Sequence, residues 1–430
     1  MRTVGLITEY NPFHNGHLHH LQESLRVTGA DVSVAVMSGH FLQRGEPALI
    51  DKWARAEMAL AAGVDLVVEL PLPWAASSAP DFARGAVQAL DALGVGSLCF
   101  GSESGDVAPL QYCADVLHNH AATITRETSK LLRRGINYPQ ARLQILAELL
   151  PSEIDPAVLA EPNNILGIEY IKALSQSKRT IQPATIHRIG AGYHDTKIGL
   201  NGIASATGIR KKLAEGEPVD SLMPLAVAQI LERIMAVGNN FSADNYFRLL
   251  LAQVFRNSAG LVNCWLIENG IENRLLSVAE KSLSLEELLV GLKSRQLTRT
   301  RIQRLLISIL LEMDKNIVRQ LFSAEPHYLH LLAVSEKGRQ FLASSRKQRK
   351  IPLIQNFSRV YATLKRYYGA ESTEYYLASQ QLKLELRATK IYTLLMHNYS
   401  GDNRNRDFYE EVKNRELKNG RNYDYPRDEN

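Results

Sequence analysis

The beginning of the chain constrains its fold more than any other stretch. Val4–Ile7 is an apolar run typical of a short buried strand. Asn11-Pro12 then ends regular structure, because proline fixes its own φ and disfavours a helical conformation in the residue before it. After Gly16, leucines recur with the spacing of one helix face. The stretch therefore predicts a strand, a tight turn and a helix, with His14, Gly16 and His17 at the turn.

Apolar strands and amphipathic helices continue to alternate along the first half of the chain. This alternation indicates a parallel sheet covered on both faces, and the right-handed crossover rule favours a doubly wound arrangement. The composition shifts near Pro218, and leucine-rich helical periodicity with few strand signals follows. The predicted fold class is α/β: a doubly wound parallel-sheet domain over residues 1–215, a mainly α-helical domain over 216–400, and a polar tail over 401–430 that is expected to fray. The later predicted strands are Val32–Met37, Leu66–Leu70, Ser97–Glu103 and Thr185–Gly190, and the helices between them include Asp51–Ala62 and Pro80–Leu93.

The first turn has the chemistry of a phosphate site. A helix that starts there aims backbone N–H groups and the positive end of its dipole at a ligand. Gly16 lets a nucleotide lie against the backbone, and His14 and His17 can donate hydrogen bonds to oxygens that gain negative charge. One alternative is a loop with surface histidines. Another uses His14, His17 and His20 as metal ligands, although no cysteine lies nearby and no acidic residue has zinc-like spacing.

A second anion site is predicted where Ser205 and Thr207 precede a basic helical segment that contains Arg210. Either hydroxyl can cap the helix while the free N–H groups and Arg210 face phosphate. Arg44 follows the second predicted strand in the turn Ser38–Gly45, where its planar fork could hold phosphate or carboxylate. The alternatives are an ordinary capped surface helix and a solvated loop arginine.

Three other positions follow predicted strands or open a helix. Gly101 ends the fourth strand, where it would let a nucleotide pack closely, and Arg188 lies near the end of the fifth. Asn163 lies in the loop Glu161–Gly167, where it could read a base or ribose. At least one of Asn163 and Asn164 is expected to cap the helix that follows.

Composition and charge limit the class of protein. The chain has 430 residues, 45% hydrophobic and 22% charged, with a formal net charge of +5. Its three cysteines form no CxxC pair, which favours a reducing compartment. Met1 leads directly into the first strand, and no uncharged apolar run approaches the roughly 20 residues of a membrane helix. The prediction is a cytoplasmic protein without a membrane segment.

Basic clusters in the second half suit RNA, although a solvated helix face explains each cluster separately. Cations bind phosphates and aromatic rings stack on unpaired bases. The clusters are Lys293–Arg304, Arg346–Lys350 and Lys365–Tyr368.

Histidine, any residue, glycine and histidine at a strand-to-helix turn resemble the signature of the nucleotidyltransferase superfamily. Taken in order, Thr8–His17, Ser38–Gly45, Asp65–Pro71 and Ser205–Arg210 resemble bacterial tRNA(Met) cytidine acetate ligases more specifically. This resemblance implies that acetate attacks the α-phosphate of ATP to give acetyl-adenylate and pyrophosphate. The acetyl group would then pass to the wobble cytidine of elongator tRNA(Met), forming N4-acetylcytidine. ATP would be a substrate, and Mg²⁺ is expected to accompany it.

The resemblance also assigns residues. The predicted catalytic set, which contacts phosphate, is His14, His17, Arg44, Ser205, Thr207 and Arg210. The predicted nucleotide-binding set is Ile7, Thr8, Glu9, Tyr10, Asn11, Pro12, Phe13, His14, Asn15, Gly16, His17, Leu18, His19, His20, Gly101, Asn163 and Arg188, with no side chain assigned to metal. Gly208 departs from the second motif.

Two other functions fit parts of the pattern. A cofactor-making adenylyl- or cytidylyltransferase would leave the basic helical half unexplained, and an RNA-binding protein could use the nucleotide site for regulation only. If the chain is a ligase, the helical half should lie against the mouth formed by Gly39–Gly45 and Gly101, because acyl transfer requires contact.

Overall fold

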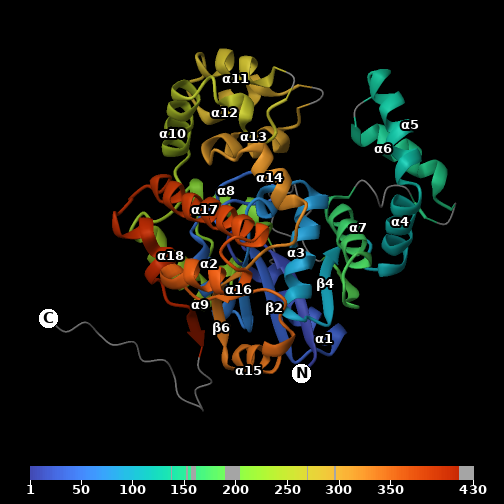
Figure 1. Ribbon diagram of the computed structural model, residues 1–430, viewed down its shortest axis with the longest axis vertical. Helices are drawn as coiled ribbons and strands as arrows, with labels where there is room; N and C mark the ends of the chain where they lie inside the picture. The colour runs from blue at the N-terminus through green and yellow to red at the C-terminus, as the bar shows by residue number, and fades with distance from the viewer. Residues whose placement is uncertain are drawn as a thin grey trace.

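The computed structural model describes residues 1–136, 138–151, 154–155, 161–188, 204–268, 270–294 and 297–415. Within them, one eight-stranded sheet has the order β5-β4-β1-β2-β3-β6-β7, with β8 paired to β6 (Figure 1). The strands are β1 Thr3–Thr8, β2 Val32–Ser38, β3 Leu66–Leu70, β4 Ser97–Ser102, β5 Gln182–His187, β6 Leu329–Ser335, β7 Leu353–Ile354 and β8 Lys413–Arg415.

The first five strands are parallel, and the strand order reverses at β1. Thr3 of β1 pairs with Val32 of β2 on one side, and Val4 pairs with Ser97 of β4 on the other. β6 is antiparallel to β3, whereas β7 and β8 run parallel to β6. In open α/β sheets ligands bind beyond the carboxyl ends of the strands at such a reversal. The fold therefore places a site beyond β1 and β4.

Alternate residues of the central strands fill two cores, one on each face of the sheet. In β2, Val34 and Val36 belong to the core that contains α3 and α7, whereas Ala35 and Met37 belong to the core that contains α1, α2 and α9. The helices up to the middle of the chain are α1 Asn15–Thr28, α2 Lys52–Ala61, α3 Ala79–Leu93, α4 Val107–Asn119, α5 Ala121–Arg133, α6 Tyr138–Leu149, α7 Pro162–Ser175, α8 Ala206–Ala214 and α9 Leu225–Ala236.

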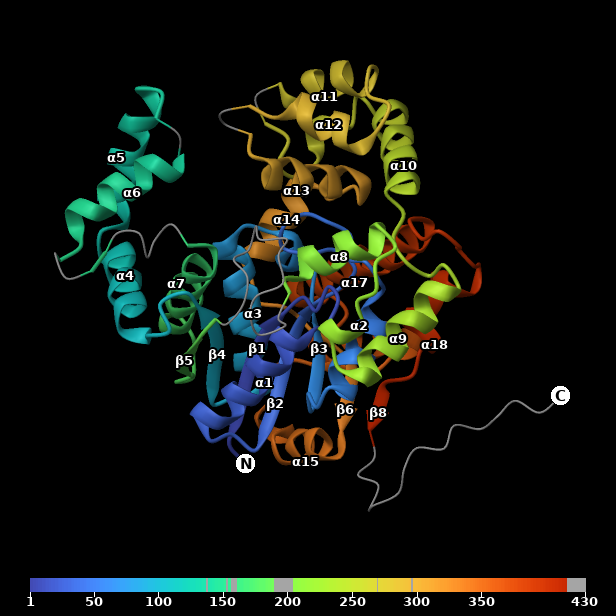
Figure 2. The same ribbon diagram turned by 180° about the vertical axis from the view of Figure 1, so that it is seen from behind.

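The second half of the chain is mainly helical. Its helices are α10 Ala243–Arg256, α11 Ile271–Ala279, α12 Leu285–Leu292, α13 Arg299–Leu310, α14 Lys315–Phe322, α15 Glu336–Ser344, α16 Val360–Tyr368, α17 Thr373–Leu394 and α18 Arg406–Tyr409. The bundle of α10–α13 and the pair α5–α6 both stand away from the sheet on the side opposite α15 (Figures 1 and 2). None of the described helices is long and apolar enough to cross a membrane.

The predicted fold class is confirmed, and the structure adds strands that the sequence analysis did not predict. β6 reads Leu-His-Leu-Leu-Ala-Val-Ser and is buried throughout. A short apolar run between helices has no period that separates a strand from a buried helix, which explains the omission. The sheet of the first half thus also contains three strands from the second half, at residues 329–335, 353–354 and 413–415. The domain boundary at residue 215 stays a prediction. Of the predicted fifth strand, Ile189 and Gly190 lie outside the described residues.

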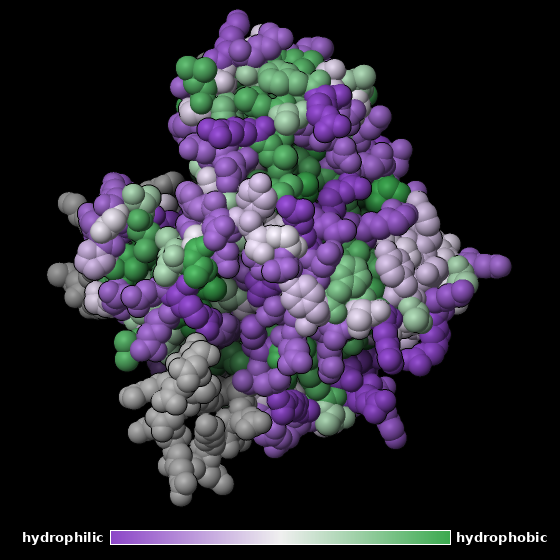
Figure 3. All heavy atoms as spheres, turned by 90° about the vertical axis from the view of Figure 1, so that its left-hand side faces the viewer, coloured by the Kyte–Doolittle hydropathy of each residue, from purple (hydrophilic) through white to green (hydrophobic). Residues whose placement is uncertain are grey.

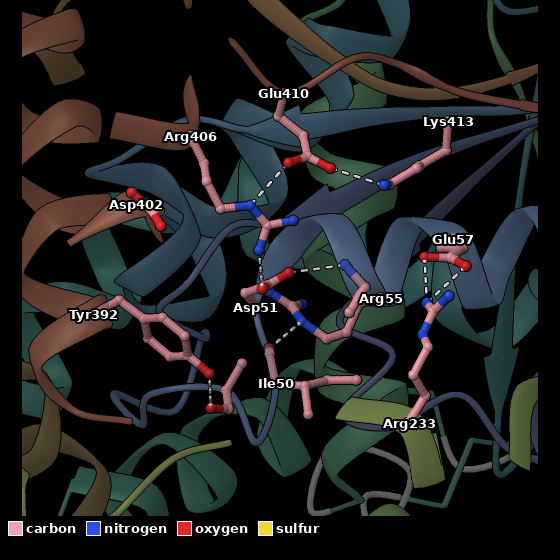
Figure 4. A network of polar contacts seen from close by, with 12 residues as sticks. Ile50, Asp51, Arg55, Glu57, Arg233, Tyr392, Asp402, Arg406, Glu410 and Lys413 are labelled. Atoms are coloured by element: carbon pink, nitrogen blue, oxygen red, sulfur yellow. Dashed lines mark hydrogen bonds and ion pairs between the residues drawn. The ribbon is translucent and has the colours of Figure 1, made fainter. Parts of the chain in front are cut away.

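The segment after residue 401 is folded as far as residue 415, where a frayed tail was expected. Asp402–Asn405 forms a 3₁₀ turn, followed by α18 and β8. Arg406 binds Asp51, the N-cap of α2, at 2.6 Å, and also Glu410 at 2.9 Å (Figure 4). The segment therefore packs on the helix beside the sheet. Residues 416–430 of the predicted tail lie outside the described residues.

Candidate active site

A pocket of about 270 Å³ lies at the carboxyl ends of β1 and β4. The turn after β1, the first turn of α1, the loop after β2, and the starts of α7 and α8 line it. It therefore occupies the reversal point of the sheet, where the parallel strand order predicts a ligand.

His14 and His17 form the start of α1. His14 is the N-cap, and its Nδ1 accepts a hydrogen bond from the Gly16 N–H at 3.0 Å. The His14 N–H donates in return to Nδ1 of His17 at 3.3 Å, so the two residues form a capping box. Because each Nδ1 accepts a hydrogen bond, the proton of each neutral ring belongs on Nε2. The ring centroids are 3.8 Å apart, so two Nε2–H donors stand side by side at the pocket.

The surroundings keep these imidazoles neutral. Burial, followed by the charges of Arg188 and Arg210, lowers the pKa of His14 to about 3. Burial and the neighbouring histidines lower the pKa of His17 well below its usual value. Burial and Arg188 lower the pKa of His20 to about 4. The rings are therefore neutral at neutral pH, and they can bind a phosphate oxygen as N–H donors rather than as cations.

A second helix, α8, also begins at this pocket. Ser205 is the N-cap of α8, and its Oγ accepts a hydrogen bond from the Gly208 N–H at 3.0 Å. Of the two hydroxyls considered as caps, Ser205 takes the position, and Gly208 supplies the capped N–H. Arg210 donates to the Asn11 carbonyl at 2.9 Å, which joins α8 to the turn after β1. The N-termini of α1 and α8 thus face one pocket, and both favour an anion there.

Arg188, Asn163 and Gly101 lie together on a third wall. Arg188 donates to Oδ1 of Asn163 at 3.3 Å. A Cβ on Gly101 would lie 3.1 Å from Cγ of Arg188, so the glycine leaves room for this arginine. Glu103 accepts from the Asn163 side chain at 2.5 Å.

The expectation that Asn163 or Asn164 caps α7 is wrong. Pro162 takes the first helical position and Glu161 the N-cap, so both asparagines lie inside the first turn. Asn164 instead accepts hydrogen bonds from the N–H groups of Glu103 and Ser104, and so holds the loop after β4.

The loop after β2 supplies Arg44, and side chains from two other segments fix the position of this loop through hydrogen bonds. Glu9 is partly buried, and the resulting loss of solvation raises its carboxyl pKa; its Oε1 accepts from the Gln43 N–H at 2.8 Å. Arg304 of α13 donates to the Gln43 carbonyl at 2.7 Å. Gly45 has a φ of +81°, and a Cβ added to it would lie 2.2 Å from the backbone nitrogen of Arg304. The helical half therefore contacts the Gly39–Gly45 loop, which is one of the two segments against which it was predicted to lie.

The structure places all of the predicted site residues at the pocket except four. Every member of the predicted catalytic set lines the pocket. Phe13 is fully buried between Tyr10 and His17, and Asn15 donates to the Ser221 carbonyl at 3.0 Å. The residues of the nucleotide set that do not line the pocket are Pro12, Phe13, Asn15 and Leu18.

Gln43 and Glu46 line the same pocket but were not selected from the sequence. Gln43 directly precedes Arg44, and Glu46 follows it by two residues. This closeness to Arg44 in the sequence was the signal that could have identified them. Within the described residues, no group of three or more His, Cys, Asp or Glu side chains could hold a metal ion.

The basic cluster Arg346–Lys350 lies away from this pocket. Lys350 pairs with Asp91 at the C-terminal end of α3 at 2.7 Å, and Arg349 donates to the Leu342 carbonyl at 2.6 Å. The C-terminal end of α3 precedes β4, so it lies at the amino edge of the parallel strands. Half of this cluster therefore holds the protein together at the edge opposite the pocket.

This combination of fold and site defines the chain as a HIGH nucleotidyl transferase. The family model described as HIGH Nucleotidyl Transferase matches residues 1–407. The chain is 54% identical over 410 residues to the tRNA(Met) cytidine acetate ligase of Syntrophotalea carbinolica, covering 95% of this chain and 98% of the relative. It is 38% identical over 404 residues to the enzyme of that name from Caldanaerobacter subterraneus, covering 93% and 97%. The chain belongs to the tRNA(Met) cytidine acetate ligase family, which confirms the resemblance drawn from its motifs.

A solved structure agrees with this assignment. Thermotoga maritima TmcAL bound with alpha-thio ATP superimposes with a TM-score of 0.87 at 33% identity, covering 97% of this chain and 100% of that chain. The apo form of the same protein gives a TM-score of 0.89 over the same shares.

Proposed function

We propose that this protein activates acetate with ATP and transfers the acetyl group to N4 of the wobble cytidine of elongator tRNA(Met). The relatives' names and the ATP analogue bound to the similar T. maritima protein support this proposal. The observation that carries it is the pair of neutral imidazoles in a pocket that is lined by the N-termini of two helices. Such a site suits a triphosphate, and it suits the charge that develops at an α-phosphate.

In the activation step, an acetate oxygen bonds to the α-phosphorus and the bond to the bridging oxygen of pyrophosphate breaks. Pyrophosphate leaves with that electron pair, which leaves acetyl-adenylate. His14 and His17 donate through Nε2–H to the α-phosphate oxygens, where charge grows. Arg44, Arg188 and Arg210 neutralise the phosphates.

In the transfer step, the cytosine amine attacks the acetyl carbon, the bond from that carbon to the phosphate oxygen breaks, and AMP leaves with the electron pair while the amine loses a proton. Activation is needed because acetate is a poor acyl donor and the lone pair of the amine is delocalised into the ring. An anticodon base is already unpaired, so presenting it costs less than opening a duplex. We expect Mg²⁺ to arrive on the ATP phosphates, retaining several waters and needing few protein ligands. We also expect the reaction to take place in the cytoplasm.

The test is acetate-dependent exchange of pyrophosphate into ATP, followed by mass spectrometry of acetylated tRNA nucleosides. His14→Asn should lower exchange by about 10²–10³-fold, because it removes an Nε2–H donor while its Oδ1 can still cap α1. His118→Asn, on the exposed side of α4, is the matched control and should exchange normally. Exchange that proceeds equally well without acetate would overturn the proposal.

A further inference from the structure

A second cavity of about 190 Å³ adjoins the nucleotide pocket. It lies between the Gly45–Leu49 loop and helices α10, α12 and α13. Glu46 and Arg210 line both spaces, so these two side chains form their common boundary. The face of the molecule drawn in Figure 3 also shows apolar surface on the α10–α13 bundle and where it meets the body.

The walls of this cavity are apolar and partly aromatic. The rings of Phe241 and Tyr246 lie 6.0 Å apart at an angle of 57°. The aliphatic residues come from the loop, α12 and α13, and they are Leu49, Leu285, Leu289 and Leu306. Such walls suit a flat aromatic ring that moves from water into the cavity when it binds.

Polar side chains also line the cavity, namely Glu46, Arg210, Arg299 and Gln303. Glu46 accepts a hydrogen bond from Nε2 of Gln303 at 2.8 Å and lies 3.6 Å from Arg210. Tyr246 is 3% exposed, and its hydroxyl is buried with no hydrogen-bond partner. Burial and the charge of Glu46 raise the pKa of this hydroxyl, so it stays protonated. A buried polar group without a partner is costly, and a ligand with a hydrogen-bonding edge would satisfy it.

The volume limits the occupant to about one six-membered ring. A cavity of about 150 Å³ is enough to hold benzene. A whole nucleotide does not fit, whereas a single pyrimidine does. Among the pyrimidines, cytosine is the one that carries an exocyclic amine, and a glutamate carboxylate is a natural acceptor for it.

We propose that this cavity receives the acceptor cytosine, flipped out of the tRNA, with its amine directed at Glu46. The inference rests on the proposed function and adds the place where its second substrate binds. With the amine at the boundary, its nitrogen faces the acyl-adenylate in the adjoining pocket. The new N–C bond then forms as the bond between the acetyl carbon and the phosphate oxygen breaks. The amine proton passes to the Glu46 carboxylate, and AMP leaves with the electron pair.

Filling the cavity tests this assignment. Leu289→Trp should lower acetyl transfer to tRNA by about 10²-fold, because the base can no longer reach the boundary. Acetate-dependent exchange should persist, since Leu289 does not line the nucleotide pocket. Val290→Trp is the matched control, because Val290 is the next residue of α12 and is 60% exposed. Transfer that is unchanged in Leu289→Trp would overturn the proposal.

Tyr246→Phe provides a test that does not depend on how the bundle tolerates tryptophan. It removes one oxygen, and transfer to tRNA should fall about tenfold while exchange stays normal. Thermal unfolding of both variants checks that the bundle is intact. If Tyr246→Phe transfers as fast as the unaltered protein, the cavity is a packing void. If the unaltered protein shows no acetate-dependent exchange, the proposed function fails instead.

Discussion

His14 performs two tasks with the two nitrogens of one ring. Nδ1 accepts the Gly16 N–H and starts α1, which leaves Nε2–H free for a ligand at the pocket. Because the capping contact fixes the tautomer, the fold itself determines which nitrogen donates. The positive charges of Arg188 and Arg210 oppose protonation of the same ring. A site built to attract phosphate therefore also keeps its histidine neutral.

This arrangement predicts a pH dependence of stability. The unfolded chain binds a proton on His14 with a pKa near 6.5, whereas the folded protein binds it only near pH 3. Between these values the unfolded state binds more protons, so stability falls as the pH falls. Between pH 7 and pH 5, the free energy of unfolding should drop by about 2 kcal/mol more in the unaltered protein than in His14→Asn. Urea denaturation measures this, and parallel curves for the two proteins would contradict it.

At the scale of elements, α2 holds the ends of β1 and β2. Arg55 is completely buried and donates to the carbonyls of Glu9 at 2.6 Å, Ser38 at 2.9 Å, Ile50 at 3.1 Å and also Gly39. Glu9 and the residues after Ser38 lead directly into the pocket. One side chain thus positions the two loops that follow neighbouring strands.

Arg55→Lys should therefore disturb both stability and nucleotide binding. A single ammonium cannot reproduce the planar fork that meets these carbonyls, so some are left buried without a partner. We expect the free energy of unfolding to fall by about 1–3 kcal/mol and KM for ATP to rise, with the fold retained. Chemical denaturation and exchange kinetics measure the two effects. An unchanged KM at a temperature where the variant is fully folded would show that Arg55 has no part in positioning the loops.

The sequence was sufficient to predict elements whose signals are local. The first four strands, the helices between them and a cap at Ser205 or Thr207 follow from apolar spacing and capping chemistry. β6 was missed because its partner, β3, lies more than 250 residues away in the chain. The second cavity was missed for the same reason, since Glu46, Tyr246 and Leu289 converge only in the folded chain. At Asn164 a local signal misled the prediction: asparagine is a good helix cap, but α7 begins earlier, at Pro162.

At the scale of the whole molecule, the end of the chain supports the catalytic half. Lys52 of α2 is completely buried and lies 2.8 Å from both Glu69 of β3 and Asp407 of α18. These two carboxylates raise the pKa of Lys52, which therefore stays charged inside the protein. Arg406 pairs with Asp51 one residue earlier, and Tyr392 of α17 donates to the Ala48 carbonyl at 2.8 Å (Figure 4). Residues from the last tenth of the chain thus hold the start of α2 and the loop before it.

Removing this support should weaken the nucleotide site from a distance. A chain ending at Gly401 leaves Lys52 with one carboxylate and Asp51 without Arg406. Breaking a buried ion pair on one side costs about 3–5 kcal/mol, because the remaining charge is uncompensated. The truncated protein should therefore lose several kcal/mol of unfolding free energy and should exchange pyrophosphate more slowly. A chain ending at Arg415 is the control, since it keeps every one of these contacts. Asp407→Asn narrows the test to one pair, and equal unfolding curves for this variant and the unaltered protein would show that the C-terminal segment does not stabilise α2 through Lys52.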